Sequence, residues 1–226
     1  MSIEVCLRKF TESEILGLGE MKSIKKDVVS ALQQQLGKKP EWKEGKSEDE
    51  DSLPLGGWTA LAQLQRYAAH IDLADKPPEK PEEDVDAFEE DEHLLQYWES
   101  AENELSNNHL RFRHLIWVGS IGVFYIPVDF PEPILIKEER EEEEEEENEE
   151  GVEYISIGSS YQLLKELNEI NQWLNLQGDY KELGNLVTKD IFENEADQWR
   201  EIKWAWLVLQ WMAKQSIKKQ LTICFE

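Results

Sequence analysis

The middle of the sequence brings an imidazole, a phenol and a carboxylate into one β-rich stretch. Residues 111–134 contain His114, Tyr125 and Asp129. If the stretch folds as a hairpin that turns at residues 119–122, these side chains share one face of a sheet, with the diagonal neighbours of His114 roughly 7 to 8 Å away at Cα. Groups of these types can transfer protons. A hydrolase with a His114/Tyr125/Asp129 site is therefore one hypothesis, and a hydrogen-bonded polar spot in the sheet is the simpler interpretation.

Two serines follow the next β-rich run and extend this candidate site. Ser159 and Ser160 stand after Gly158, where a strand is expected to pass into a helix. The amides of a helix N-terminus can hold an anion, and the order His, Asp, Ser could be drawn as a hydrolytic triad. However, no G-x-S-x-G elbow supports a nucleophilic serine, and a serine here is typical of a helix N-cap. The sequence thus offers five candidates and assigns none of them a catalytic role.

The other histidines and the cysteines show no ligand spacing. His70, His93 and His109 stand at unrelated positions on or beside expected helices. Cys6 and Cys224 lie near opposite ends of the chain, which fits neither a metal motif nor a disulfide framework. No Walker loop, dinucleotide fingerprint or zinc motif is present. The sequence therefore predicts structural histidines, two buried thiols, no metal and no cofactor.

Negative charge is concentrated in three segments of the chain, whose formal net charge is −25. Residues 138–150 carry eleven Glu and one Arg, residues 76–104 carry twelve acids and two Lys, and residues 41–51 carry six acids and two Lys. The rest of the chain is close to neutral. Runs of like charge repel themselves and cannot bury apolar area. We therefore expect a single globular domain over residues 1–226, with acidic loops or insertions at about 41–51, 76–90 and 138–150.

This distribution of charge favours a basic protein as the partner, because acidic segments attract basic surfaces at long range. A toxin or nuclease domain that an acidic protein would neutralise is one example. Phosphate contacts need basic patches, so we expect no nucleic-acid partner. The simpler interpretation of the three acidic runs, and the preferred one, is solvated loops that only keep the protein soluble.

No stretch has the roughly 18 apolar residues of a membrane-spanning helix, and the first residues lack the order of a signal peptide. We therefore expect a cytoplasmic protein with no membrane contact. The leading hypothesis is a soluble, non-enzymatic protein that acts by macromolecular interaction, and the hydrolase described above is the alternative.

The periodicity of apolar residues predicts the secondary structure. Strands are expected at 3–8, in both halves of 111–134, at 152–157 and at 221–225, and helices include 24–36, 58–71, 161–174 and 195–220. In all we expect about seven helices and four or five strands, without the regular alternation of a doubly wound sheet. The expected class is α+β, with one mixed or antiparallel sheet.

The last helix is expected to be apolar nearly all round and unusually rich in tryptophan. It contains Trp199, Trp204, Trp206 and Trp211. Since a helix of this kind is buried on most sides, we expect it at the centre of the fold or in a homodimer interface. The first and last strands are expected to lie side by side, which would make Cys6 and Cys224 neighbours.

Overall fold

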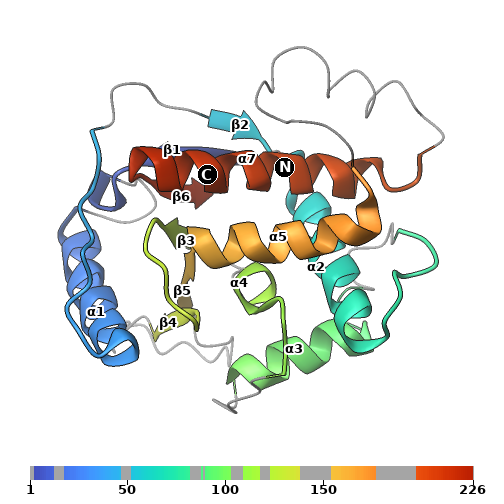
Figure 1. The fold of residues 1–226 in the computed structure, drawn as a ribbon, viewed down its shortest axis with the longest axis horizontal. Helices are drawn as coiled ribbons and strands as arrows, with labels where there is room; N and C mark the ends of the chain where they lie inside the picture. The colour runs from blue at the N-terminus through green and yellow to red at the C-terminus, as the bar shows by residue number, and fades with distance from the viewer. Residues whose placement is uncertain are drawn as a thin grey trace, which may run out of the picture.

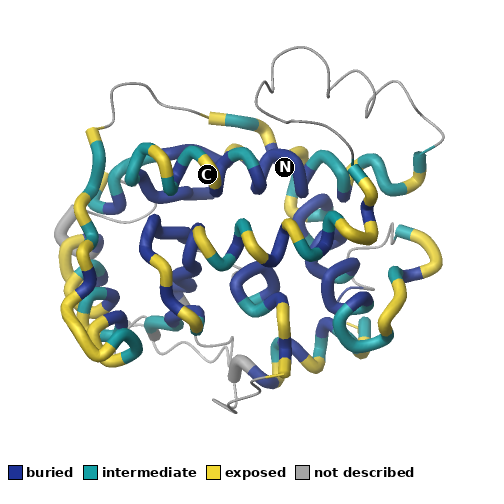
Figure 2. Tube along the Cα trace, in the orientation of Figure 1, coloured by how far each residue is buried: buried dark blue, intermediate teal, exposed yellow. Residues whose placement is uncertain are grey.

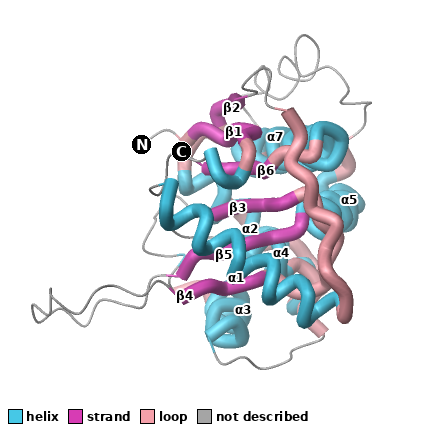
Figure 3. Tube along the Cα trace, turned by 90° about the vertical axis from the view of Figure 1, so that its left-hand side faces the viewer, coloured by secondary structure: helices cyan, strands magenta, loops and turns pink. Residues whose placement is uncertain are grey.

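The structure is a computed structural model that describes residues 3–12, 18–46, 52–81, 88, 90–102, 109–117, 123–137, 154–176 and 197–225. Within these ranges the chain forms one mixed six-stranded sheet and six α-helices. A single helix covers one face of the sheet, and the other helices lie on the opposite side (Figure 1, Figure 3). The expected α+β class with one mixed sheet is confirmed, although the sheet has more strands than the four or five predicted.

The sheet has the strand order β2-β1-β6-β3-β5-β4. Its strands are β1 (Glu4–Arg8), β2 (Ser52–Pro54), β3 (Val123–Ile126), β4 (Ile134–Lys137), β5 (Tyr154–Ser159) and β6 (Thr222–Phe225). Neighbours are antiparallel except β3 and β5, which run parallel. The edge strands β2 and β4 were not predicted, because each is only three or four residues long and adjoins prolines and acidic residues that mask a period of two.

Successive side chains on the strands belong alternately to two separate apolar cores. In β3, Phe124 and Ile126 belong to the core beneath α1 (Leu18–Leu36), together with Val28 of that helix. Val123 and Tyr125 belong to the core on the other face. This is the period of two that places successive strand residues on opposite faces, and it explains why every residue of β3 is buried.

The second core lies beneath five helices. These are α2 (Trp58–Leu73), α3 (Glu92–Glu102), α4 (Arg113–Ile116), α5 (Ser160–Leu174) and α7 (Arg200–Lys219). The Trp-rich helix α7 packs against α2, α5, β1 and β6. Its Trp206 is fully buried and donates from Nε1 to the Leu167 carbonyl of α5 at 2.6 Å. Figure 2 shows buried residues along α7, α2 and the strands.

The terminal strands are neighbours, as expected. β1 pairs with β6 in a register that sets Cys6 opposite Cys224, and both thiols are buried. The Cys6 thiol donates to the Cys224 carbonyl at 3.6 Å. The expectation of two buried thiols is confirmed.

The predicted hairpin in residues 111–134 is wrong. Residues Arg113–Ile116 form the short helix α4 instead of a strand, and β3 pairs with β5 and β6. β3 therefore lies inside the sheet and not at its edge. Pro127 follows the last residue of β3, so its missing N–H removes no ladder hydrogen bond. The expected turn at residues 119–122 lies outside the described residues.

The glutamate tract at 138–150 and the acids at 47–51 and 82–87 also lie outside the described residues. The expected domain organisation therefore stays a prediction. Among the described residues, no helix combines the length and apolar character needed to cross a membrane.

Gly158 of β5 is expected to be intolerant of any side chain. A Cβ at this position would collide with the ring of Tyr125, which is fully buried and has no room to move aside. Overpacking of this kind should make Gly158→Ala less stable by about 2 kcal/mol, measured by urea unfolding. If the collision is the cause, the same change should cost much less in a Tyr125→Leu background; equal costs in both backgrounds would contradict this explanation.

Candidate functional site

His114 connects α4 to β5 and to the segment that contains Pro131. It lies in α4 and is almost completely buried. Its Nδ1 accepts the backbone N–H of Ser159 at 3.0 Å, and its Nε2 donates to the carbonyl of Pro131 at 3.1 Å. Both ring nitrogens are therefore engaged by backbone groups. Burial lowers the pKa of His114 to about 4, so the ring is neutral at physiological pH.

Glu166 explains why a helix forms where a strand was expected. This carboxylate of α5 is buried, and it accepts the backbone N–H groups of His114 at 3.0 Å and Leu115 at 2.8 Å. It thereby satisfies free amides at the start of α4, which has no side-chain cap of its own. Burial raises the pKa of Glu166 to about 8 despite these two hydrogen bonds.

The two serines have structural partners. The Ser159 hydroxyl donates to the Val128 carbonyl at 2.7 Å and accepts the N–H of Gln162 at 3.2 Å, so Ser159, one of the two serines expected in this role, is the N-cap of α5. The Ser160 hydroxyl is 2.7 Å from that of Ser216 in α7. Neither contact supplies a base that could activate a serine.

The remaining two candidates have other hydrogen-bonding environments than His114. Asp129 is exposed and accepts from Gln162 Nε2 at 2.7 Å. Tyr125 is buried beside Gly158, and its hydroxyl has no hydrogen-bond partner among the described residues. Burial raises the pKa of Tyr125 well above its usual value. Hence His114 and Ser159 do meet, but through a backbone amide, and no contact among the described residues favours the hydrolase alternative.

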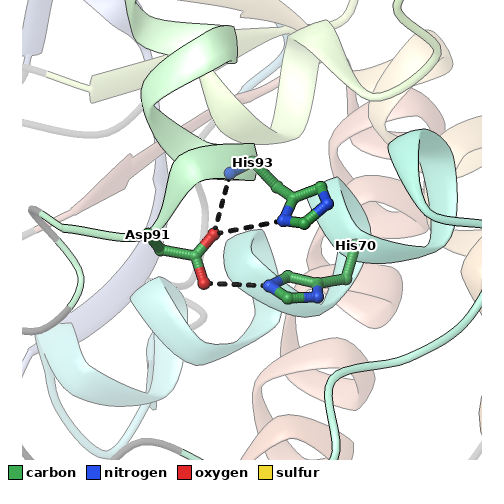
Figure 4. A group of neighbouring side chains, drawn as sticks. All are labelled: His70, Asp91 and His93. Atoms are coloured by element: carbon green, nitrogen blue, oxygen red, sulfur yellow. Dashed lines mark hydrogen bonds and ion pairs between the residues drawn. The ribbon is translucent and has the colours of Figure 1, made fainter.

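A second polar cluster joins α2 to α3. Asp91 precedes α3 and caps it, accepting the N–H groups of His93 and Leu94 at its Oδ1. Its Oδ2 accepts from Arg66 Nε at 2.7 Å and from His70 Nε2 at 2.8 Å. Figure 4 shows both imidazole rings presenting a nitrogen to the Asp91 carboxylate.

The electrostatics of this cluster favour an ionised carboxylate. Burial alone would raise the pKa of Asp91, but hydrogen bonds from His70, Arg66 and the Leu94 amide outweigh burial and lower it. Burial lowers the pKa of His93, and so does the neighbouring His70 ring, whose centroid lies 4.2 Å away. His70, Asp91 and His93 are the described residues whose side-chain atoms could hold a metal ion.

Sequence reasoning missed both Glu166 and this cluster. Glu166 interrupts the apolar stripe of α5, being adjacent to Leu163, Leu167 and Ile170 on the buried face. A charged residue on such a stripe is a detectable signal of a buried partner. For the cluster, only Asp91 carried a signal, as an aspartate directly before a helix; nothing local indicates that residues 70 and 93 meet.

An open groove of about 660 Å³ lies between the first turns of α2 and α7. Gly56, Gly57 and Trp204 contribute to its walls, and Trp204 Nε1 donates to the Pro54 carbonyl at 3.0 Å. Arg200 and Glu201 are the charged residues of its lining. It contains no cluster of titratable groups that would favour a reaction.

Acidic side chains are exposed around α3. Asp75 and Glu79 lie between α2 and α3, Glu90 precedes α3, and Glu92 and Glu99 are exposed on its outer side. The opposite side of α3 buries Leu94 and Tyr97 against the second core. We call these five acids the α3 acidic face. Figure 1 places α3 on the side of the molecule away from α7.

Comparison with known proteins relates this acidity to a family. A family model with the description "Putative DNA-mimic protein" matches residues 14–225, which is nearly the whole chain. The chain belongs to this family. No curated protein and no solved structure matches.

The expectation of no nucleic-acid partner is overturned by this membership. A family of DNA mimics implies imitation of DNA and binding of proteins that bind DNA. Basic patches are needed to bind phosphates, but an acidic surface can take the place of the phosphates themselves. A basic protein partner is compatible with the family.

His114 should make folding sensitive to acid. The pKa of His114 is lowered in the folded state. Its contribution to the free energy of unfolding is therefore complete above the unfolded pKa near 6.5 and is lost as the pH falls towards 4, which lowers the free energy of unfolding by up to about 3 kcal/mol. His114→Gln cannot take up this proton. Urea unfolding between about pH 7 and pH 4 should show a shallower loss for His114→Gln than for the natural chain or for His109→Gln, whose ring is exposed. Identical pH slopes would contradict the prediction.

Glu166 should have the opposite pH dependence. Its pKa is raised in the folded state, so its contribution to the free energy of unfolding is complete below the unfolded value near 4.5 and is lost, by about 1.4 kcal/mol per pH unit, as the pH rises from there to about 8. Glu166→Gln removes this titration while keeping one acceptor. Glu166→Ala leaves two buried amides without an acceptor and should cost about 3 kcal/mol at neutral pH. Equal stability of the Ala variant and the natural chain in urea would refute the capping role.

Proposed function

We propose that this protein binds the DNA-contacting surface of a basic protein, with its exposed carboxylates in place of backbone phosphates. The membership of the chain in a DNA-mimic family carries the proposal. In this role the protein needs no catalytic group. It competes with DNA by occupying the same surface of the partner.

The distribution of charge supports the proposal. Three segments hold almost all of the net charge of −25, whereas the rest of the chain is nearly neutral. Several acids of the described body are neutralised by neighbours: Asp72 by Arg111, Asp91 by Arg66, and Asp197 by Lys203. The acidity available to a partner is therefore concentrated in the three acidic segments.

The α3 acidic face is a described part of this acidity, and its geometry suits the role. Glu92 and Glu99 lie two turns apart, about 10 Å along the helix axis. This is close to the axial distance spanned by three steps of one DNA strand, at about 3.4 Å each. Five further acids stand between residues 82 and 89 of the sequence, within the acidic segment 76–104. A partner's Lys and Arg residues placed for phosphates could contact carboxylates at this spacing.

The test uses charge-matched variants of the full chain. One carries Glu90→Gln, Glu92→Gln and Glu99→Gln on the α3 acidic face; the control carries Glu4→Gln, Asp27→Asn and Glu201→Gln at exposed positions outside the three acidic segments. The immobilised natural chain captures proteins from a lysate, which are then eluted with duplex DNA. Binding of an eluted protein should weaken about tenfold in the first variant, since each exposed ion pair contributes up to about 1 kcal/mol. The control should bind almost normally.

One result would contradict the proposal, and another would exclude the α3 acidic face as the binding surface. Captured proteins that stay bound in saturating duplex DNA do not use their DNA-binding surface. Equal affinities of the two charge-matched variants would place recognition outside the α3 acidic face. Deletion of residues 138–150 then discriminates further: unchanged capture and salt dependence would mean that the glutamate tract is not the recognition element.

A further inference from the structure

We propose that His70, Asp91 and His93 form a binding site for a divalent transition-metal ion of the zinc type. The two imidazoles come from the last turn of α2 and the first turn of α3, and the carboxylate precedes α3. One ligand atom from each residue lies within 4.8 Å of the other two. The site is independent of the proposed interaction with a DNA-binding protein.

The distances are close to those around a single ion. Zinc binds nitrogen and oxygen ligands at about 2.0 to 2.2 Å, so two ligands of one ion lie at most about 4 Å apart. His70 Nε2 is 2.8 Å from Asp91 Oδ2, and His93 Nδ1 is 3.9 Å from Asp91 Oδ1. These two distances end on different carboxylate oxygens. A tetrahedral ion bound by one of these oxygens needs the three ligand atoms, which now lie within 4.8 Å of one another, to come to about 3.4 Å apart.

The ligand types decide the class of metal. Imidazole nitrogens favour zinc, copper, nickel or cobalt, whereas magnesium and calcium prefer an all-oxygen site. Two histidines and one carboxylate leave a further coordination position for water. The side chains are accessible enough for an ion to enter, being 14% exposed in His70, 9% in Asp91 and 30% in His93.

The structure also shows what opposes metal binding. The guanidinium of Arg66 lies 2.7 Å from Asp91 Oδ2 and repels a cation, and the ion must replace the hydrogen bond between His70 and Asp91. The two backbone amides that donate to Asp91 Oδ1 do not oppose the metal ion. They belong to the first turn of α3 and hold the carboxylate in its present orientation. An ion at this site would fasten α3 to α2 and so fix the helix that carries the α3 acidic face.

The test is a titration of the untagged full chain with Zn²⁺, and with Co²⁺ as a spectroscopic probe, in excess Mg²⁺. The Mg²⁺ occupies clustered carboxylates, which bind cations weakly, and does not compete for imidazole. We expect one saturable Zn²⁺ site per chain and a visible Co²⁺ absorption band. His70→Gln and His93→Gln should each weaken Zn²⁺ binding at least tenfold, whereas the matched control His109→Gln should leave it unchanged.

Thermal unfolding keeps the proposal testable if a variant is itself less stable. Zn²⁺ should raise the unfolding temperature of the natural chain and of His109→Gln, because it binds only the folded state, but not that of His93→Gln. Absence of saturable binding in excess Mg²⁺ would overturn the proposal. Equal Zn²⁺ affinities in the His70, His93 and His109 variants would overturn it as well.

Discussion

Repulsion among carboxylates is the constraint that this fold has to satisfy. The chain has 49 acidic residues against 24 basic ones, and such an excess opposes any compact state. The described body meets the constraint by pairing. Asp91, Asp72 and Asp197 each lie against an arginine or lysine. The remaining excess of acids is concentrated in three segments of the sequence, so the two apolar cores form in a nearly neutral body. The same separation leaves a concentrated negative surface for a basic partner.

Residues that resemble a catalytic site serve packing in this protein. His114, Glu166 and Ser159 join α4, α5 and β5 through hydrogen bonds to backbone amides and carbonyls. A buried amide without an acceptor costs more than its hydrogen bond contributes, which is why polar side chains occur in this core. The opposite pKa shifts of His114 and Glu166 follow from burial in both cases, because burial disfavours a charged imidazole and a charged carboxylate alike.

The sequence predicted the long elements that have a regular apolar period. The prediction failed where a residue far away in the sequence determines the local structure. Helices α1, α5 and α7, the Ser159 cap and the pairing of the terminal strands follow from apolar periods and capping chemistry. The hairpin failed because residues 113–116 have β-type composition, yet Glu166, more than fifty residues away, accepts their amides. His70 and His93 likewise meet only because α3 packs on α2. No local pattern contains such tertiary contacts.

The proposed function requires that acidic side chains of this chain occupy the surface through which a partner binds DNA. Carbodiimide cross-linking, which joins a carboxylate to a lysine in direct contact, tests it most directly. In a complex with a captured DNA-binding protein, Glu90, Glu92 and Glu99 should become linked to lysines that duplex DNA protects from modification in the same partner. Links confined to lysines that DNA leaves unprotected would contradict the account.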